Sequence, residues 1–132
     1  MSKRETPMTL AYWSRIGGTL IEEYMIVAPG EGRGVRLVDA IVLTDGPRER
    51  LPVDARRHVG LDGRDVVIVQ TKASRLGMYL LGQAYFSKHL VERYFKPRSV
   101  RTVAVCTATD AVLLPIAVEH GVEVVVLPIG GE

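Results

Sequence analysis

The spacing of apolar residues predicts a helix near the start of the chain. Four apolar residues recur at intervals of three and four, the period of one face of an α-helix. They are Ile16, Leu20, Tyr24 and Val27. We therefore expect a helix over residues 12–27, weakened in its first turns by the pair Gly17-Gly18 and ended by Pro29. Residues 1–11 have no such pattern and are expected to form a loose N-terminal arm.

Apolar, β-branched runs predict strands in the rest of the chain. They cover residues 35–43, 65–71, 99–106 and 122–127. The clearest is D-V-V-I-V-Q-T at 65–71, whose nearly continuous apolar character is typical of a strand buried on both faces. Residues 48–63 are polar, rich in arginine and without period, and are interpreted as a loop, with or without a short strand at its start.

Two helical segments alternate with the later strands. Residues 76–95 carry an inward stripe, and Asp110 can cap a second helix that runs to His120. The stripe consists of Leu76, Leu80, Ala84, Ser87, Val91 and Tyr94. Alternating strands and helices imply parallel pairing, whereas strands in direct succession in the first half imply a hairpin. The expected fold is a single α/β domain over residues 1–132, with a mixed central sheet flanked by helices on both sides.

Composition adds little to this picture. A net charge of +2 does not by itself indicate a nucleic-acid partner. The basic residues are thirteen Arg and four Lys; arginine suits phosphate, but a bias in genomic base composition explains the excess equally well. The chain has no apolar run long enough to span a bilayer and no signal-peptide pattern at its start, and Cys106 is its only cysteine. These features predict a cytoplasmic protein.

Three polar residues stand out in the predicted strands. Asp39 lies in an otherwise apolar strand, where a carboxylate is costly to bury unless it is paired or binds a metal; a solvent-facing side chain is the alternative. Gln70 and Lys72 are two residues apart at the end of the next clear strand, so they share one face. If the two strands pair as a hairpin, Asp39 can lie beside Gln70.

This arrangement is chemically suited to a hard cation beside an ammonium. Asp39 supplies a carboxylate, Gln70 an amide oxygen and Thr71 a backbone carbonyl, which are ligands that Mg²⁺ accepts together with water and phosphate. Mn²⁺ is expected to substitute. Lys72 can then orient the attacking water and stabilise charge that develops on a phosphate.

The sequence around these residues resembles the PD-(D/E)xK nuclease superfamily. The matching segments are R-L-V-D-A-I-V-L around Asp39 and V-V-I-V-Q-T-K-A around Gln70 and Lys72, within approximately residues 12–107. Gln before x-Lys is similar to the pattern of Mrr-type restriction endonucleases, which are related to the archaeal Holliday-junction resolvases. The resemblance implies a restriction endonuclease-like core, a divalent metal held by the Asp and the Gln, and a catalytic Lys.

The resemblance also implies a glutamate on the first helix and includes two departures. Glu22 and Glu23 are both candidates for that glutamate, and a solvated helix face is the alternative for either. Val38 stands where the family name places Pro, and Gln70 stands where it places an acid. The second departure lowers the negative charge of the site and puts its metal affinity in question.

Further residues are candidate contacts to DNA. A basic loop and its surroundings would bind backbone phosphate without reading sequence, although a solvated loop explains them equally well. The arginines are Arg48, Arg50, Arg56, Arg57, Arg64 and, just after Lys72, Arg75. Gln83 and Ser87, four apart on the long helix, can contact the site or DNA, or form a core hydrogen bond.

Three hypotheses for the function follow. The first is a Mg²⁺-dependent DNA endonuclease, expected to be a homodimer because a cut through both strands needs two sites. The second is a regulatory or binding protein that keeps the nuclease fold without catalysis, which the missing acid at Gln70 motivates. The third is a Rossmann-like sensor of small molecules, based on the strand–helix alternation of the second half.

Overall fold

The structure is a computed structural model that describes residues 1–54 and 59–128. Within these ranges the chain forms three helices and six strands. In chain order they are α1 (Glu5–Ile16), β1 (Thr19–Val27), β2 (Arg36–Leu43), β3 (Glu49–Arg50), β4 (Asp65–Thr71), α2 (Met78–Tyr94), β5 (Ser99–Cys106), α3 (Leu113–Glu119) and β6 (Val122–Val126). Two of the arginines predicted to contact DNA, Arg56 and Arg57, lie outside the described residues.

The beginning of the chain differs from the sequence-based expectation. Residues expected to form a loose arm belong to helix α1, and residues 19–27 form strand β1 instead of continuing a helix. The predicted helix over 12–27 was wrong because Gly17 and Gly18 adopt φ angles of 71° and 83°, which end the helix. The following T-L-I-E-E-Y-M-I-V is rich in β-branched and aromatic residues, which favour a strand.

The strands form one mixed sheet in the order β3-β1-β2-β4-β5-β6. Strand β2 is antiparallel to β1 and to β4, whereas β4, β5 and β6 run parallel to one another. The second half thus has the expected strand–helix–strand connections. The short strand β3 extends the sheet at the edge beside β1. In the register of β2 and β4, Ala40 pairs with Val69, which places Asp39 next to the end of β4.

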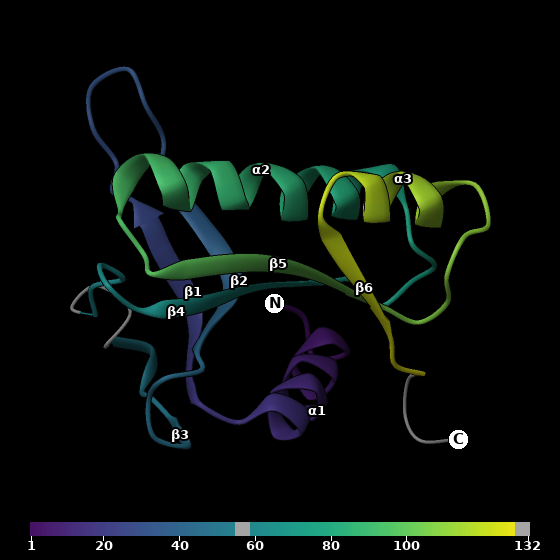
Figure 1. The fold of residues 1–132 in the computed structure, drawn as a ribbon, viewed down its shortest axis with the longest axis horizontal. Coiled ribbons are helices and arrows are strands. Elements are labelled where there is room, and N and C mark those ends of the chain that lie inside the picture. Colours follow the sequence, from purple (N-terminus) through teal and green to yellow (C-terminus); the bar gives the residue numbers. More distant parts are fainter. Residues whose placement is uncertain (55–58, 129–132) are drawn as a thin grey trace.

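Helices cover both faces of this sheet (Figure 1). Helix α2 lies along one face, with α3 beside it over the β6 end, and α1 lies against the other face. Met8 and Tyr12 of α1 pack with valines of β4 and β5, while Val91 of α2 packs with residues of β1, β2 and β4. Strands β2 and β4 are therefore buried in the middle of the fold. None of the helices in the described part of the chain is long and apolar enough to cross a membrane.

Candidate active site

The candidate site lies where two strands change the face that they present to the core. Ile21 and Tyr24 of β1 belong to one apolar cluster, although residues three apart point to opposite faces of a regular strand. Val38 and Ile41 of β2 show the same switch in the same cluster. Between the two β1 residues, Glu23 has a φ of 51°, an uncommon conformation for a residue other than glycine.

This irregularity places Glu23 across from Asp39. Two neighbouring pairs of the strand register enclose the position: Glu22–Ala40 and Tyr24–Val38. Irregular pairing of this kind re-aims side chains and is frequent next to active sites. The backbone of β1 and β2 is thus distorted at the level of the aspartate that the sequence singled out.

Asp39 is tied to β4 through both its side chain and its backbone. Its Oδ2 accepts a hydrogen bond of 2.8 Å from the N–H of Thr71, and its own N–H donates one of 3.2 Å to Oε1 of Gln70. Burial raises the pKa of the Asp39 carboxyl, against the lowering effect of the Thr71 hydrogen bond. The negative charges of Glu5 and Glu23 also raise it. A carboxylate in such surroundings is stabilised by a bound cation.

Gln70 is buried, and its amide is held at both ends. Its Nε2 donates 2.9 Å to Oγ of Ser87, which in turn donates 2.6 Å to the carbonyl of Gln83. This chain connects β4 to α2 and turns the amide oxygen of Gln70 toward Asp39. Ser87 therefore orients a site residue, whereas Gln83 takes part through its backbone carbonyl.

Lys72 follows β4, and its side chain is exposed. Its backbone N–H donates 2.9 Å to the carbonyl of Val105, which continues the pairing with β5. The next N–H, that of Ala73, donates 3.3 Å to Oε2 of Glu5 on α1. Burial alone would raise the pKa of the Glu5 carboxyl, but hydrogen bonds from Ser2 and Ala73 and the charge of Lys72 together lower it. Glu5 is thus ionised beside Lys72.

Glu5 is a site residue that the sequence reasoning missed. It begins the first helix, whereas Glu22 and Glu23, the glutamates expected on that helix, lie on β1. A local signal was present in S-K-R-E. Ser2 Oγ accepts from the N–H of Glu5, and Glu5 Oε1 accepts from the N–H of Ser2, both at 3.2 Å, the reciprocal pattern that starts many helices. Pro7 also fits a first helical turn.

Glu23 contributes to a cluster of negative charge at the site. The α-amino group of Met1 donates 2.6 Å to its Oε1. That hydrogen bond is the largest cause of a raised pKa of the amino group, and the charges of Asp39 and Glu5 act in the same direction. Three carboxylates thus act on one ammonium, which shows that the site favours a cation.

Glu22 is engaged elsewhere. It is buried, and its carboxylate accepts hydrogen bonds of 2.8 Å and 3.1 Å from the guanidinium of Arg50 on β3. This bidentate pair closes the β1–β3 edge of the sheet. Arg50, one of the arginines predicted to contact DNA, is therefore neutralised within the protein.

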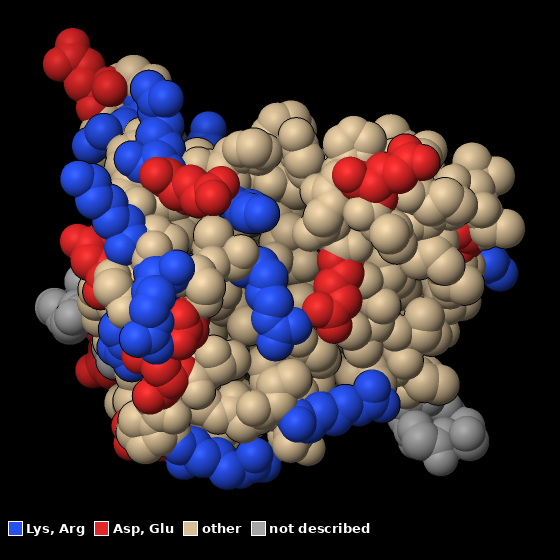
Figure 2. All heavy atoms as spheres, in the orientation of Figure 1, with Lys and Arg blue, Asp and Glu red and all other residues tan. Residues whose placement is uncertain are grey.

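Three of the other arginines predicted to contact phosphate also have partners inside the chain. Arg48 lies 5.3 Å from the ring centroid of Trp13, Arg64 pairs with Asp45 at 2.9 Å, and Arg75 donates 2.7 Å to the carbonyl of Thr109. Figure 2 shows basic and acidic side chains interleaved on this face of the molecule. Contact of these arginines with DNA remains a prediction.

The residues around Asp39 fit a sparsely ligated metal site. In the part of the chain that the structure describes, no three His, Cys, Asp or Glu side chains are grouped so as to hold a metal by themselves. Mg²⁺ needs only one or two carboxylates, because water and substrate phosphate complete its shell. Asp39 with the amide oxygen of Gln70 and the carbonyl of Thr71 is such a donor set, in the negative field of Glu5 and Glu23.

Comparison with known proteins identifies the fold. No protein-family model and no curated protein matched the sequence. A repair endonuclease from Pyrococcus abyssi matches with a TM-score of 0.60 and 17% identity over 97% of this chain and 47% of its own. EndoMS, in a complex with double-stranded DNA, matches with a TM-score of 0.59 and 13% identity over 100% of this chain and 48% of its own. The chain thus spans about half the length of each, and it has the restriction endonuclease-like α/β fold.

Proposed function

We propose that this chain is a metal-dependent DNA endonuclease that hydrolyses phosphodiester bonds. The observation that carries the proposal is the direct link between Asp39 and the end of β4, where Gln70, Thr71 and Lys72 follow one another. A half-buried carboxylate with a raised pKa, an amide oxygen and an ammonium meet there on a fold shared with two endonucleases.

Each residue has a distinct role in this proposal. Asp39, Gln70 and the carbonyl of Thr71 hold Mg²⁺ or Mn²⁺. When bound, the metal polarises the phosphate and lowers the pKa of water. Lys72 orients the attacking water and stabilises the charge on the phosphate oxygens. Glu5, through Ala73, positions the chain segment that carries Lys72.

The substrate side of the proposal is DNA in the cytoplasm. Arg75, close after Lys72, and the loop arginines Arg48, Arg50, Arg56 and Arg57 are the proposed contacts to the phosphate backbone. Because several of them already have partners within the chain, DNA must compete with those contacts. Binding should therefore be weak and sensitive to salt, as expected for contacts to phosphate alone.

A second candidate is a nuclease-fold protein that binds DNA without cutting it. It is favoured by Gln70, a neutral residue whose amide already hydrogen-bonds to Asp39 and Ser87. The Rossmann-like sensor is not retained, because β2 is antiparallel to both of its neighbours and such folds have mostly parallel sheets.

One experiment separates the two candidates. The purified chain is incubated with linear, supercoiled and branched DNA in Mg²⁺, in Mn²⁺ and in a chelator, and Mn²⁺ binding is measured by calorimetry. The endonuclease proposal expects cleavage with metal, none with chelator, and a binding heat for Mn²⁺. DNA binding without cleavage or metal heat would support the inactive protein, and the enzyme proposal would be wrong.

A further inference from the structure

An uncharged apolar surface covers the side of the molecule formed by α2 and α3. No charged residue occurs in residues 76–87, nor in residues 111–118. Five large apolar side chains in these segments are between 44% and 74% exposed. They are Met78, Tyr79 and Phe86 on α2, and Val112 and Ile116 at α3. We refer to these five residues as the α2–α3 face.

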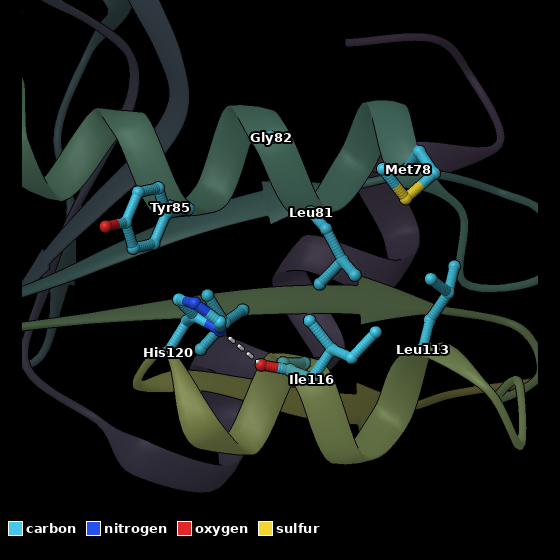
Figure 3. A pocket seen from close by; sticks show the side chains of 9 residues that line it. Met78, Leu81, Gly82, Tyr85, Leu113, Ile116 and His120 are labelled. Atoms are coloured by element: carbon cyan, nitrogen blue, oxygen red, sulfur yellow. Dashed lines mark hydrogen bonds between the residues drawn. The ribbon is translucent and has the colours of Figure 1, made fainter.

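A groove runs between the two helices within this face (Figure 3). It has a volume of about 200 Å³. Its walls come from α2 and α3 and are almost entirely apolar. The main lining residues are Met78, Leu81 and Tyr85 on one side, and Leu113, Ile116 and His120 on the other.

Gly82 leaves the α2 wall of the groove open. It lies inside a helix, where glycine costs about 0.5–1 kcal/mol relative to alanine. A Cβ atom at this position would meet nothing within 4 Å, so no neighbouring atom of the described chain demands a glycine there. The missing side chain creates room that the isolated chain does not use, which indicates close approach of another molecule.

The same face carries the side chains that could fill this room. Tyr79, Gly82 and Phe86 are spaced by three and four residues and share one stripe of α2. Projecting aromatic rings thus stand beside the open position. A surface that offers both projections and a recess can pair with itself about a two-fold axis, because each copy supplies what the other lacks.

Charge and area also favour a second copy as the occupant. A two-fold contact places like against like, so a charged face would repel itself, whereas the α2–α3 face carries no charge. At about 200 Å² for a fully exposed aromatic side chain and somewhat less for the others, the exposed fractions correspond to on the order of 600 Å². That approaches the roughly 800 Å² per partner of a stable interface, and it is at the upper limit for the largest apolar patch of a monomer.

We propose that a second copy of this chain docks on the α2–α3 face, with Tyr79 and Phe86 of each copy seated over Gly82 of the other. The proposal needs neither metal nor DNA and stands apart from the nuclease activity. If both proposals hold, the dimer supplies the two sites that a cut through both strands requires.

Sedimentation equilibrium of the protein alone, from about 1 to 100 μM, tests this interface. Wild type is expected to dimerise. Phe86→Glu, which places like charges at the contact, and Gly82→Leu, which fills the recess while improving helix propensity, are expected to remain monomeric with unchanged circular dichroism. Val118→Glu is the matched control, since Val118 is a comparably exposed residue of α3 that does not line the groove, and it should dimerise like wild type.

Three results would overturn the proposal. The first is a wild-type chain that stays monomeric over the whole range. The second is a dimer that survives both Phe86→Glu and Gly82→Leu, because it would form through another surface. The third is a monomer that co-sediments with phosphatidylcholine vesicles and loses this property in Phe86→Glu, because the face would then bind lipid instead of a second copy.

Discussion

The N–H of Thr71 donates a hydrogen bond of 2.8 Å to Oδ2 of Asp39, a residue 32 positions earlier in the chain. Together with the bond from the Asp39 N–H to Gln70, it fixes the carboxylate against the end of β4, two residues before Lys72 leaves the strand. The aspartate is thus positioned by the strand that carries the other candidate residues. This relationship is the basis of the predictions on the site.

Replacement of Asp39 by Asn should separate function from stability. The variant keeps the shape and an acceptor for the Thr71 N–H but removes a charge that burial, Glu5 and Glu23 all disfavour. We expect a thermal midpoint equal to or above that of wild type, no Mn²⁺ heat in calorimetry, and a loss of cleavage of at least about 10²-fold. Cleavage at the wild-type rate would remove Asp39 from the site.

Replacement of Lys72 by Ala should abolish cleavage without unfolding the protein. An ammonium that stabilises charge in the transition state typically contributes about 10²–10³ in rate. Because Lys72 is exposed, its truncation should leave the thermal midpoint nearly unchanged. Lys96→Ala, another exposed lysine after the far end of α2, is the matched control and should cut at the wild-type rate. Equal rates in single-turnover assays of the two variants would argue against a catalytic Lys72.

Replacement of Gln70 by Glu restores the acid that the family pattern has and should raise the affinity for Mn²⁺ in calorimetry. It should also lower the free energy of unfolding by about 1–3 kcal/mol, because the Nε2 donor to Ser87 is lost in a buried position. Ser87→Ala supplies the comparison, since it removes the same hydrogen bond without adding charge. A stability loss with no gain in metal affinity would show that Gln70 is not a metal ligand.

Removal of Arg50 should lower stability but not cleavage. Arg50→Ala leaves the buried carboxylate of Glu22 without its two hydrogen bonds. Because the Arg50 side chain is about half exposed, water screens part of the loss, and we expect a cost near 1 kcal/mol in urea unfolding. Glu22→Gln should retain cleavage for the same reason. A strong loss of cleavage in Glu22→Gln, with the fold intact, would place Glu22 in the active site after all.

Asp65 should make stability depend on pH in the acid range. Hydrogen bonds from Arg98 and Ser99 lower the pKa of its carboxyl from 3.8 to about 2. A lowered pKa contributes stability that is present above the ordinary value and is lost as the pH falls through the folded value. In urea unfolding, Asp65→Asn should therefore be less stable than wild type at neutral pH, and the difference should shrink between about pH 4 and pH 2. A difference that stays constant over this range would contradict the assignment.

The sequence by itself determined the central and C-terminal parts of the fold. Strand β5 has the predicted bounds, and β4 and the helix between them are close to expectation, because long apolar runs and a sustained helical stripe leave few alternatives. The choice of Asp39 and Gln70 as neighbours also followed from local sequence. A polar residue in a buried strand is costly, and that cost is visible without coordinates.

Only the tertiary structure decided the beginning of the chain and the surroundings of the site. Local spacing favoured one long helix, but two glycines with positive φ and pairing with β2 give a helix followed by a strand. That change moves Glu22 to the Arg50 contact, sets Glu23 opposite Asp39 and brings Glu5 of α1 next to Ala73. These contacts join residues from 22 to 68 positions apart. Sequence patterns report local periodicity, whereas such contacts depend on how the whole sheet pairs and which face each helix covers.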